Sequence, residues 1–187
     1  MLIMHIAHKI ENDSKIQSIK EHLESTANKA KDFGNSFNNG DYAYICGMLH
    51  DIGKYSANFQ NKIINNTNSR VDHSTAGAIE INKTIDLFGK LLAYCIAGHH
   101  GGLPDGGNKS DTASEVTLNG RLKRAKQLPD YSYFEKEINI ADFLPDKCPN
   151  IKPLNKGGFS LSFYIRMLYS CLVDSDFLDT EAFMSSN

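Results

Sequence analysis

Apolar residues recur along the chain with the spacing of helices rather than of strands. A Ser14-x-x-Gln17 spacing predicts a capping box that opens the first helix, and Gly34 ends it. One face of this helix is apolar, with Ile16, Ile19, Leu23, Ala27 and Ala30. Residues 1–9 alternate weakly, which predicts a short N-terminal strand or an extended arm.

The rest of the chain continues the helical pattern, with one long loop at residues 101–120. Helices are expected over residues 41–52, 56–64, 74–85, 87–97, 131–138 and 159–178, and a basic amphipathic segment over 120–128. These elements predict an all-α fold, a single domain over residues 1–187 built as a helical bundle, with one short strand near the N-terminus.

Composition narrows the class of protein. The 187 residues are 41% hydrophobic and 22% charged, which is typical of one globular domain with a sizeable core. A net charge of -2 excludes a global basic field, so any contact with nucleic acid must be local. No apolar run reaches the ~20 residues of a membrane span. The 4 cysteines are scattered without a C-x-x-C pair, which indicates reduced thiols and a cytoplasmic location.

A charged pair interrupts the most apolar of the predicted helices. Residues 42–49 are apolar almost all round, and His50-Asp51 follow directly. An ionised carboxylate there is costly unless a positive group meets it. Gly53 is read as the residue that stops the helix. The pair is therefore expected in the last turn of a core helix, facing a partner.

Other polar residues also stand at apolar helix borders. Asp174 continues a stripe at i, i+3, i+4 and i+7 formed by Tyr164, Met167, Leu168 and Cys171. Taken singly, Asp174 could lean into water, and a lone histidine is more often a satisfied core residue than a ligand. Taken together, the residues predict a metal site without cysteine in the bundle core, comprising His22, His50, Asp51, His73, His99, His100 and Asp174. Five histidines favour Mn, Fe, Co, Ni or Zn over Mg. His5 and His8 are assigned to structure or surface.

The order His22, His50-Asp51, Asp174 resembles the H…HD…D pattern of the HD phosphohydrolase superfamily. The stretches "LHDIGK", "VDHSTAGA", "AGHHGGLPD", "RMLYSCLVDSDFLDTE" and "IKEHLEST" closely resemble the HD nuclease of type I CRISPR interference. That family is the nuclease part of a helicase–nuclease that degrades target DNA in antiviral defence, after a CRISPR RNA-guided surveillance complex has recognised it.

The resemblance implies a role for each matching residue. One metal ion would be held by His22, His50, Asp51 and Asp174, and a second by Asp51 with His73, His99 and His100. Asp51 would bridge the two ions, which would offset the cost of burying its charge. Lys54 resembles the family lysine that helps to hold a phosphate or the attacking water, and Ser74 is expected to bind the scissile phosphate.

The resemblance also implies single-stranded DNA as the substrate. The loop 101–120 and the basic residues Arg121, Lys123, Arg124 and Lys126 are expected to line its groove. On spacing alone, a solvated helix face remains the alternative for this basic run.

The chain departs from the family in one respect, because it has no G-x-x-x-x-G-K-[ST] phosphate loop of a superfamily 2 helicase. The helicase is expected on a separate polypeptide, or the chain is an excised domain that ends at Asn187. Two other readings stay open. One is a phosphohydrolase of nucleotides or cyclic dinucleotides, and the other is a non-catalytic, metal-stabilised module that recruits a helicase.

Overall fold

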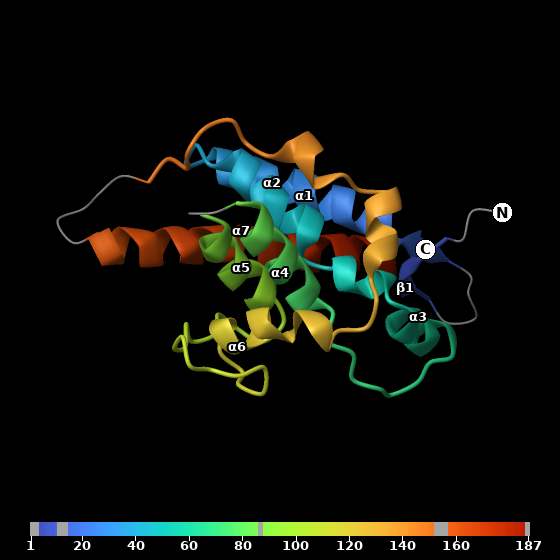
Figure 1. Cartoon of the computed structure of the whole chain (residues 1–187). Helices are drawn as coiled ribbons and strands as arrows, with labels where there is room; N and C mark the ends of the chain where they lie inside the picture. Colours follow the sequence, from blue (N-terminus) through green and yellow to red (C-terminus); the bar gives the residue numbers. More distant parts are fainter. Residues whose placement is uncertain (1–3, 11–14, 86–87, 152–156, 186–187) are drawn as a thin grey trace.

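The computed structural model describes residues 4–10, 15–85, 88–151 and 157–185. Its helices form a bundle beside one small sheet (Figure 1). In chain order the helices are α1 (Ile19–Asn35), α2 (Gly40–Leu49), α3 (Ala57–Ile64), α4 (Ser74–Thr84), α5 (Gly89–Gly98), α6 (Leu118–Leu122) and α7 (Gly157–Ser185). The all-α prediction is confirmed.

Two short antiparallel strands, β1 (Ile6–Lys9) and β2 (Ile16–Ser18), precede the bundle. The register pairs His8 with Gln17 and shifts next to that pair. The predicted N-terminal strand is β1, and its partner β2 was not predicted. Three residues are too few for the alternation of apolar and polar side chains to be recognised in a sequence.

The start of α1 differs from the prediction. Gln17 belongs to β2, and Ser14 lies outside the described residues. The capping box is formed by Ser18 and Glu21 instead: the Ser18 side chain accepts from the Glu21 N–H, and the Glu21 carboxylate accepts from the Ser18 N–H at 2.9 Å. Because both free N–H groups are satisfied there, the helix begins at Ile19.

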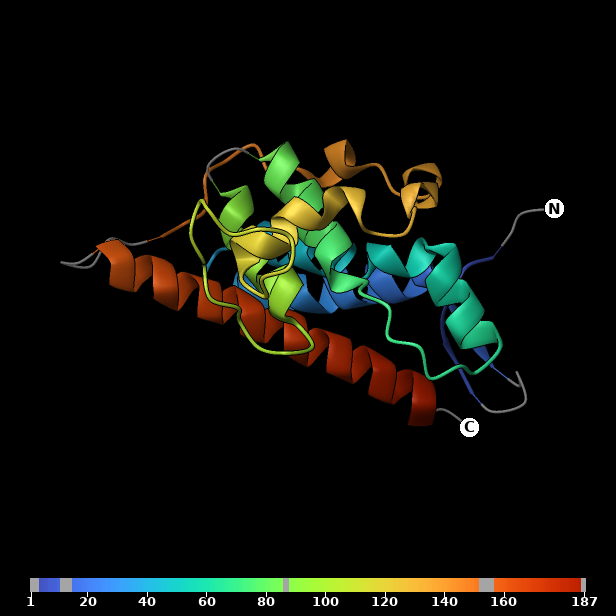
Figure 2. The same cartoon turned by 60° about the horizontal axis from the view of Figure 1, so that its bottom comes forward.

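The bundle core is closed by α7, which packs along α1, α2 and α5 (Figure 1). When the view is turned, the Gly157 end of α7 still extends beyond the other helices (Figure 2). The largest apolar side chains with almost no exposure come from these four helices, from α4 and α6, and from the segment after α2: Ile19, Leu23, Ile45, Leu49, Ile52, Ile81, Leu92, Ile96, Leu118, Leu168 and Leu172. Burial of this apolar surface holds the helix ends in place around the polar residues described below.

The segment after α2 turns more sharply than predicted. The helix ends at Leu49 rather than at residue 52, and a 3₁₀ turn, η2 (Ile52–Tyr55), follows. Gly53 lies inside this turn, so it is not the helix stop that the sequence suggested. A Cβ atom on Gly53 would collide with the backbone of His73. The glycine therefore allows the segment before α4 to approach the end of α2.

The segments between α5 and α7 are less regular than predicted. The basic segment is the short α6 followed by the turn η3 (Lys123–Lys126), and the helix expected over 131–138 is the turn η4 (Ser132–Lys136). None of the described helices combines the length and the apolar character that crossing a membrane requires.

Candidate metal centre

Five separate segments bring histidine and aspartate side chains to one point in the bundle. His22 comes from the first turn of α1, and Asp176 comes from α7. The other residues lie at helix ends: His50 and Asp51 after α2, His73 before α4, and His99 and His100 after α5. Helix ends are the places where a tightly packed bundle can direct polar side chains inward without breaking its apolar faces.

The inner group consists of His22, His50, Asp51 and Asp176. The Nε2 atoms of His22 and His50 are 3.2 Å apart. His22 Nε2 lies 3.4 Å from Asp51 Oδ2 and 3.3 Å from Asp176 Oδ1. His50 Nε2 lies 3.3 Å and 3.6 Å from the same two oxygens. His22, His50 and Asp51 are fully buried, so water cannot solvate these atoms.

The outer group consists of Asp51, His73, His99 and His100. Its carboxylate oxygen is the other one, Asp51 Oδ1, which lies 3.4 Å from His73 Nε2 and 3.3 Å from His99 Nε2. The Nε2 atoms of His73 and His100 are 2.8 Å apart, and His100 is exposed. Asp51 therefore faces both groups, with one oxygen turned to each.

Backbone carbonyls determine which ring nitrogen faces each group. Nδ1 of His50 lies 2.8 Å from the Gly47 carbonyl, and Nδ1 of His99 lies 2.8 Å from the Ile96 carbonyl. His73 Nδ1 is likewise 3.0 Å from a backbone carbonyl, that of residue 71. A carbonyl accepts only, so each Nδ1 donates and each neutral ring presents the lone pair of Nε2 to the site. Lone pairs that converge on carboxylate oxygens repel one another unless a cation lies between them.

Unsatisfied atoms show that a metal ion fits this arrangement. Both carboxylate oxygens of Asp51 and Nε2 of His99 are buried without a hydrogen bond to any described residue. Lys54 Nζ forms an ion pair with Asp51 Oδ2 at 2.7 Å, which supplies one positive charge to this carboxylate. Imidazole and carboxylate ligands without thiolate are typical of catalytic sites for divalent transition metals. The two groups can thus hold metal ions.

Proton binding distinguishes the two groups. Burial alone would lower the pKa of His50, but the carboxylates of Asp51 and Asp176 outweigh it and raise this pKa to about 10. Burial would raise the pKa of Asp51, yet Lys54 and His50 hold it well below its ordinary value. In the outer group, burial lowers the pKa of His73, and burial together with His99 lowers the pKa of His100 to about 4. Near neutral pH the inner group therefore holds a proton that a metal ion must displace.

This difference predicts proton release when metal binds. Adding Mn²⁺ to the metal-free chain near pH 8 in a weak buffer should release about one proton for each ion in the inner group, because the ligand must be neutral imidazole. In the metal-free chain, stability from protonated His50 is fully present below about pH 6.5 and is lost as pH rises towards about 10. Thermal unfolding should therefore occur at lower temperature at pH 9.5 than at pH 6.5, and Mn²⁺ should reverse the loss.

The matched control for proton release is His50→Ala, which removes the proton that would be displaced. Proton uptake, or no change in pH, on adding Mn²⁺ to the parent chain would contradict the assignment of the inner group.

The structure corrects the last predicted ligand. Asp174 is exposed, and its carboxylate lies 3.5 Å from Ser170 Oγ, away from both groups. The carboxylate in the inner group is that of Asp176. The buried face of α7 continues through Leu172, Ser175 and Asp179. Successive helical residues are about 100° apart, so Asp174 and Asp176 lie on opposite flanks of that face, and only the Asp176 flank meets α1.

A further carboxylate, Asp179, was missed by the sequence reasoning. It is buried, and its Oδ2 accepts from His22 Nδ1 at 2.9 Å. Gln17 and Lys29 each donate to Asp179 at 2.8 Å, which anchors it between the sheet, α1 and α7. Asp179 therefore directs Nε2 of His22 into the inner group. The sequence does contain a pattern that indicates Asp179: Leu168, Leu172, Ser175 and Asp179 follow one another at helical spacing. Residue 174 is not part of this stripe.

His5, which precedes β1, and His8 within β1 have different surroundings. The ring of His5 stacks on Tyr133, with ring centroids 4.2 Å apart, which suits the structural role assigned to it. His8 instead contacts the site: its ring lies edge-on to His22 with centroids 4.7 Å apart, and its Nε2 is 3.5 Å from Lys54 Nζ. Burial and the nearby Lys54 lower the pKa of His8 to about 3. His8 belongs to neither ligand group, so its contacts place it against the metal residues without making it one of them.

The predicted substrate-binding residues are brought to the outer side of the centre. Ser74 begins α4 and accepts from Arg121 Nη2 at 2.6 Å. Lys123 Nζ lies 2.7 Å from the Lys109 carbonyl, and Arg124 Nε donates to a carbonyl of the 101–117 loop at 2.8 Å. Lys126 is exposed. The basic run is therefore not a wholly solvated face, because its first three cations are bonded to neighbouring segments.

A helical bundle that gathers histidines and aspartates into two adjoining groups has the ligands of a metal-binding protein. Residues 19–132 match the HD domain family, and the chain belongs to that family. Its members are metal-dependent phosphohydrolases, and the matched range contains the HD pair His50-Asp51 with His22 and the three outer histidines. No protein with curated annotation matches the chain.

Proposed function

We propose that this protein is a metal-dependent endonuclease that hydrolyses phosphodiester bonds of single-stranded DNA with two divalent ions. The observation that carries the proposal is Asp51, which directs one buried oxygen to each of two ligand groups. A carboxylate shared in this way places two ions side by side. Such a pair, when bound, activates a water and stabilises the attacking and leaving oxygens of an in-line displacement.

The side chains around the centre supply the remaining functions. Lys54 Nζ, 2.7 Å from Asp51 Oδ2 and almost buried, would hold the attacking water or a phosphate oxygen by charge. Arg121 donates to Ser74 Oγ, so the hydroxyl hydrogen of Ser74 is left to donate to a phosphate oxygen.

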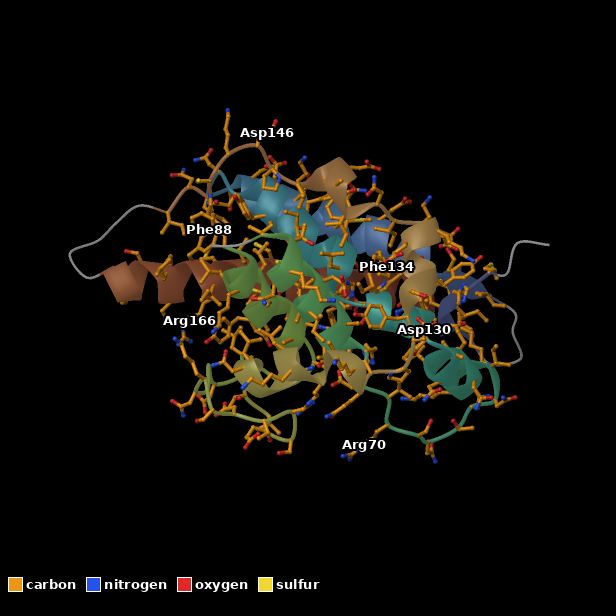
Figure 3. The ribbon with its side chains drawn as sticks, viewed as in Figure 1. Arg70, Phe88, Asp130, Phe134, Asp146 and Arg166 are labelled. Carbon is orange, nitrogen blue, oxygen red and sulfur yellow. The ribbon has the colours of Figure 1, made fainter. Side chains whose placement is uncertain are left out.

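Access to the centre is from the outer group. His22, His50 and Asp51 have no exposed surface and the Asp176 side chain is 17% exposed, whereas His100 is exposed, so a substrate phosphate would enter beside the outer histidines. Loop 65–73 and loop 101–117 lie on this side of the bundle (Figure 1). Arg70 extends outward from the first loop (Figure 3), and the exposed Lys126 follows α6. These cations would attract a phosphate backbone locally, although the chain has a net charge of -2.

The choice of a nuclease rests on the five stretches that resemble the HD nuclease of type I CRISPR interference. They include the outer histidines in "VDHSTAGA" and "AGHHGGLPD", and the inner carboxylate in "LVDSDFLDTE". On this proposal the partners are single-stranded DNA, a superfamily 2 helicase and the CRISPR RNA-guided surveillance complex. The ions are proposed to be Mn, Fe, Co, Ni or Zn rather than Mg, because five of the seven side chains in the two groups are imidazoles.

Cleavage of defined substrates tests the proposal. With Mn²⁺, Co²⁺ or Ni²⁺ added, the chain should cut circular single-stranded DNA and should leave intact duplex largely uncut, because no helicase opens it. Chelated protein should be inactive, and salt should weaken DNA binding because few phosphates are neutralised. The assay measures product length on denaturing gels.

The same assay carries its controls. An Asp51→Ala protein purified in parallel excludes a contaminating nuclease. Rapid hydrolysis of nucleotides or cyclic dinucleotides with intact single-stranded DNA would overturn the DNA substrate in favour of a small phosphate ester. Inactivity towards every substrate in every divalent ion would indicate a module that keeps metal for stability.

A further inference from the structure

The side chain of Arg121 joins two segments that are distant in the sequence. From α6 it reaches the start of α4, where Nε donates to Thr75 Oγ1 at 2.9 Å and Nη2 donates to Ser74 Oγ at 2.6 Å. In the other direction Nη1 donates to the carbonyl of Ala97 near the end of α5. One planar guanidinium thus bonds to both helices at once.

These two helix ends carry the histidines of the outer group. His73 directly precedes Ser74, and His99 and His100 come two and three residues after Ala97. The carbonyls behind His73 and His99 orient each ring within its own segment. They do not set the distance between the segments, and that distance decides whether the Nε2 atoms can share one ion.

We infer that Arg121 is a positioning residue for the outer metal group and not a contact for DNA. The inference rests on the proposed two-ion centre, but not on which phosphate ester is hydrolysed. The Arg121 side chain is only 17% exposed, and its N–H groups already have protein acceptors on two helices. Little of its hydrogen-bonding capacity is left for a phosphate.

Neighbouring charges keep the guanidinium in this position. Asp72 lies 3.5 Å from Arg121 Nη2 and also accepts from the Thr75 N–H at 3.1 Å, at the first turn of α4. Arg124 lies 3.3 Å from the other oxygen of Asp72 and donates to the Glu115 carbonyl at 2.9 Å. Asp72 therefore balances part of the Arg121 charge and links it to the 101–117 loop. A lysine at position 121 would keep the charge but would donate from a single nitrogen, which cannot bond to both helices.

Metal titration of the full chain tests the inference without reference to activity. Chelated Arg121→Gln protein is titrated with Mn²⁺ by calorimetry and with Co²⁺ by visible absorption, beside the parent chain. The matched control is Arg166→Gln, which loses the same charge from an exposed side chain on α7 that belongs to neither ligand group. Binding of single-stranded DNA is measured over a range of salt concentrations, with Lys126→Gln as the comparison within the basic run.

The parent chain and Arg166→Gln should bind two ions. Arg121→Gln should bind one ion within about 2-fold of the parent affinity and the other about 10–100-fold more weakly, as is usual for residues that orient metal ligands. The Co²⁺ spectrum of the weaker ion should change. The salt dependence of DNA binding should remain that of the parent in Arg121→Gln and should fall in Lys126→Gln.

Several results would overturn the inference. Suppose that Arg121→Gln binds both ions like the parent, while the slope of log DNA affinity against log salt concentration falls by about one. Arg121 would then be a phosphate contact. If Arg121→Gln does not fold, Thr75→Val removes the acceptor of Nε together with the hydrogen bond from Thr75 Oγ1 to Asp72. This variant should weaken the same ion, and unchanged affinities would overturn the inference. A parent chain that binds fewer than two ions would overturn the two-ion centre and this inference together. A parent that binds two ions but cuts no DNA would overturn the substrate alone.

Discussion

Replacing Asp51 with alanine should abolish phosphodiester hydrolysis and lower the affinity for metal in both groups. Asp51 is the one residue common to the inner and the outer group, and its two oxygens lie 3.3–3.4 Å from the facing imidazole nitrogens. Replacing a residue that orients a metal ligand typically lowers metal affinity or activity about 10–100-fold. Loss of a ligand that both groups share should therefore lower the metal affinity of each group more than about 100-fold. Metal content after gel filtration and cleavage of single-stranded DNA measure the two effects.

Asp51→Asn separates the loss of charge from damage to the fold. Alanine leaves Lys54, which is 5% exposed, without its anion, and an uncompensated buried charge costs roughly 3–5 kcal/mol. Asparagine keeps the volume and can hydrogen-bond to Lys54, yet its amide is a poor bridging ligand. Both variants should therefore be inactive, and Asp51→Asn should unfold at the higher temperature. Substantial nuclease activity, or two bound ions, in either variant would refute the bridging assignment.

The second large effect should distinguish two aspartates only two residues apart on α7. Asp176→Ala should lose at least about 100-fold in activity and in affinity for the inner ion, because Asp176 Oδ1 faces the Nε2 atoms of His22 and His50 at 3.3 and 3.6 Å. Asp174→Ala should stay within about 2-fold of the parent in both measurements, because the Asp174 carboxylate is exposed and contacts only Ser170 among the described side chains.

The Asp176/Asp174 pair is its own matched control, since both changes remove one carboxylate from the same helix. Thermal unfolding with chelator present shows whether either change affects the fold apart from metal. Equal losses of activity and metal affinity in the two variants, or a larger loss in Asp174→Ala, would indicate that Asp174 is a ligand, as the sequence predicted. That result would refute the assignment of Asp176 to the inner group.

Short-range patterns were sufficient for the helices and for most of the site. Apolar residues at 3.6-residue spacing predicted α1, α2, α4 and α5 within a few residues, and predicted α7 without its last seven residues. Burying one face of a helix requires that spacing whatever the helix packs against. Neighbouring residues are also enough to predict that His50-Asp51 follow an apolar helix and that three more histidines lie at helix ends: His73, His99 and His100. For this reason a metal centre at the ends of core helices could be predicted before any contact was known.

The remaining features depend on contacts between distant segments. Asp174 and Asp176 are equally close to the apolar stripe in the sequence, and only the rotation of α7 against α1 selects Asp176. His8 belongs to a strand too short to be oriented by its own pattern, and it meets the centre because β1 lies beside α1. In the sequence Arg121 is one of several cations in a basic run. Its hydrogen bonds to α4 and α5 exist only in the folded chain, so the sequence pattern could not predict them.

The sequence by itself determined a bundle of helices, its apolar faces and a set of histidines and aspartates fit for metal, since each of these depends on the spacing of neighbouring residues. The tertiary structure decided which carboxylate joins the inner group, that His8 of β1 touches it, and that Arg121 bonds to protein. The physical reason is that a side chain can bind the metal only if it points into the site, and rotating its helix by a fraction of a turn directs it elsewhere. That direction is set by packing among helices that are far apart in the sequence.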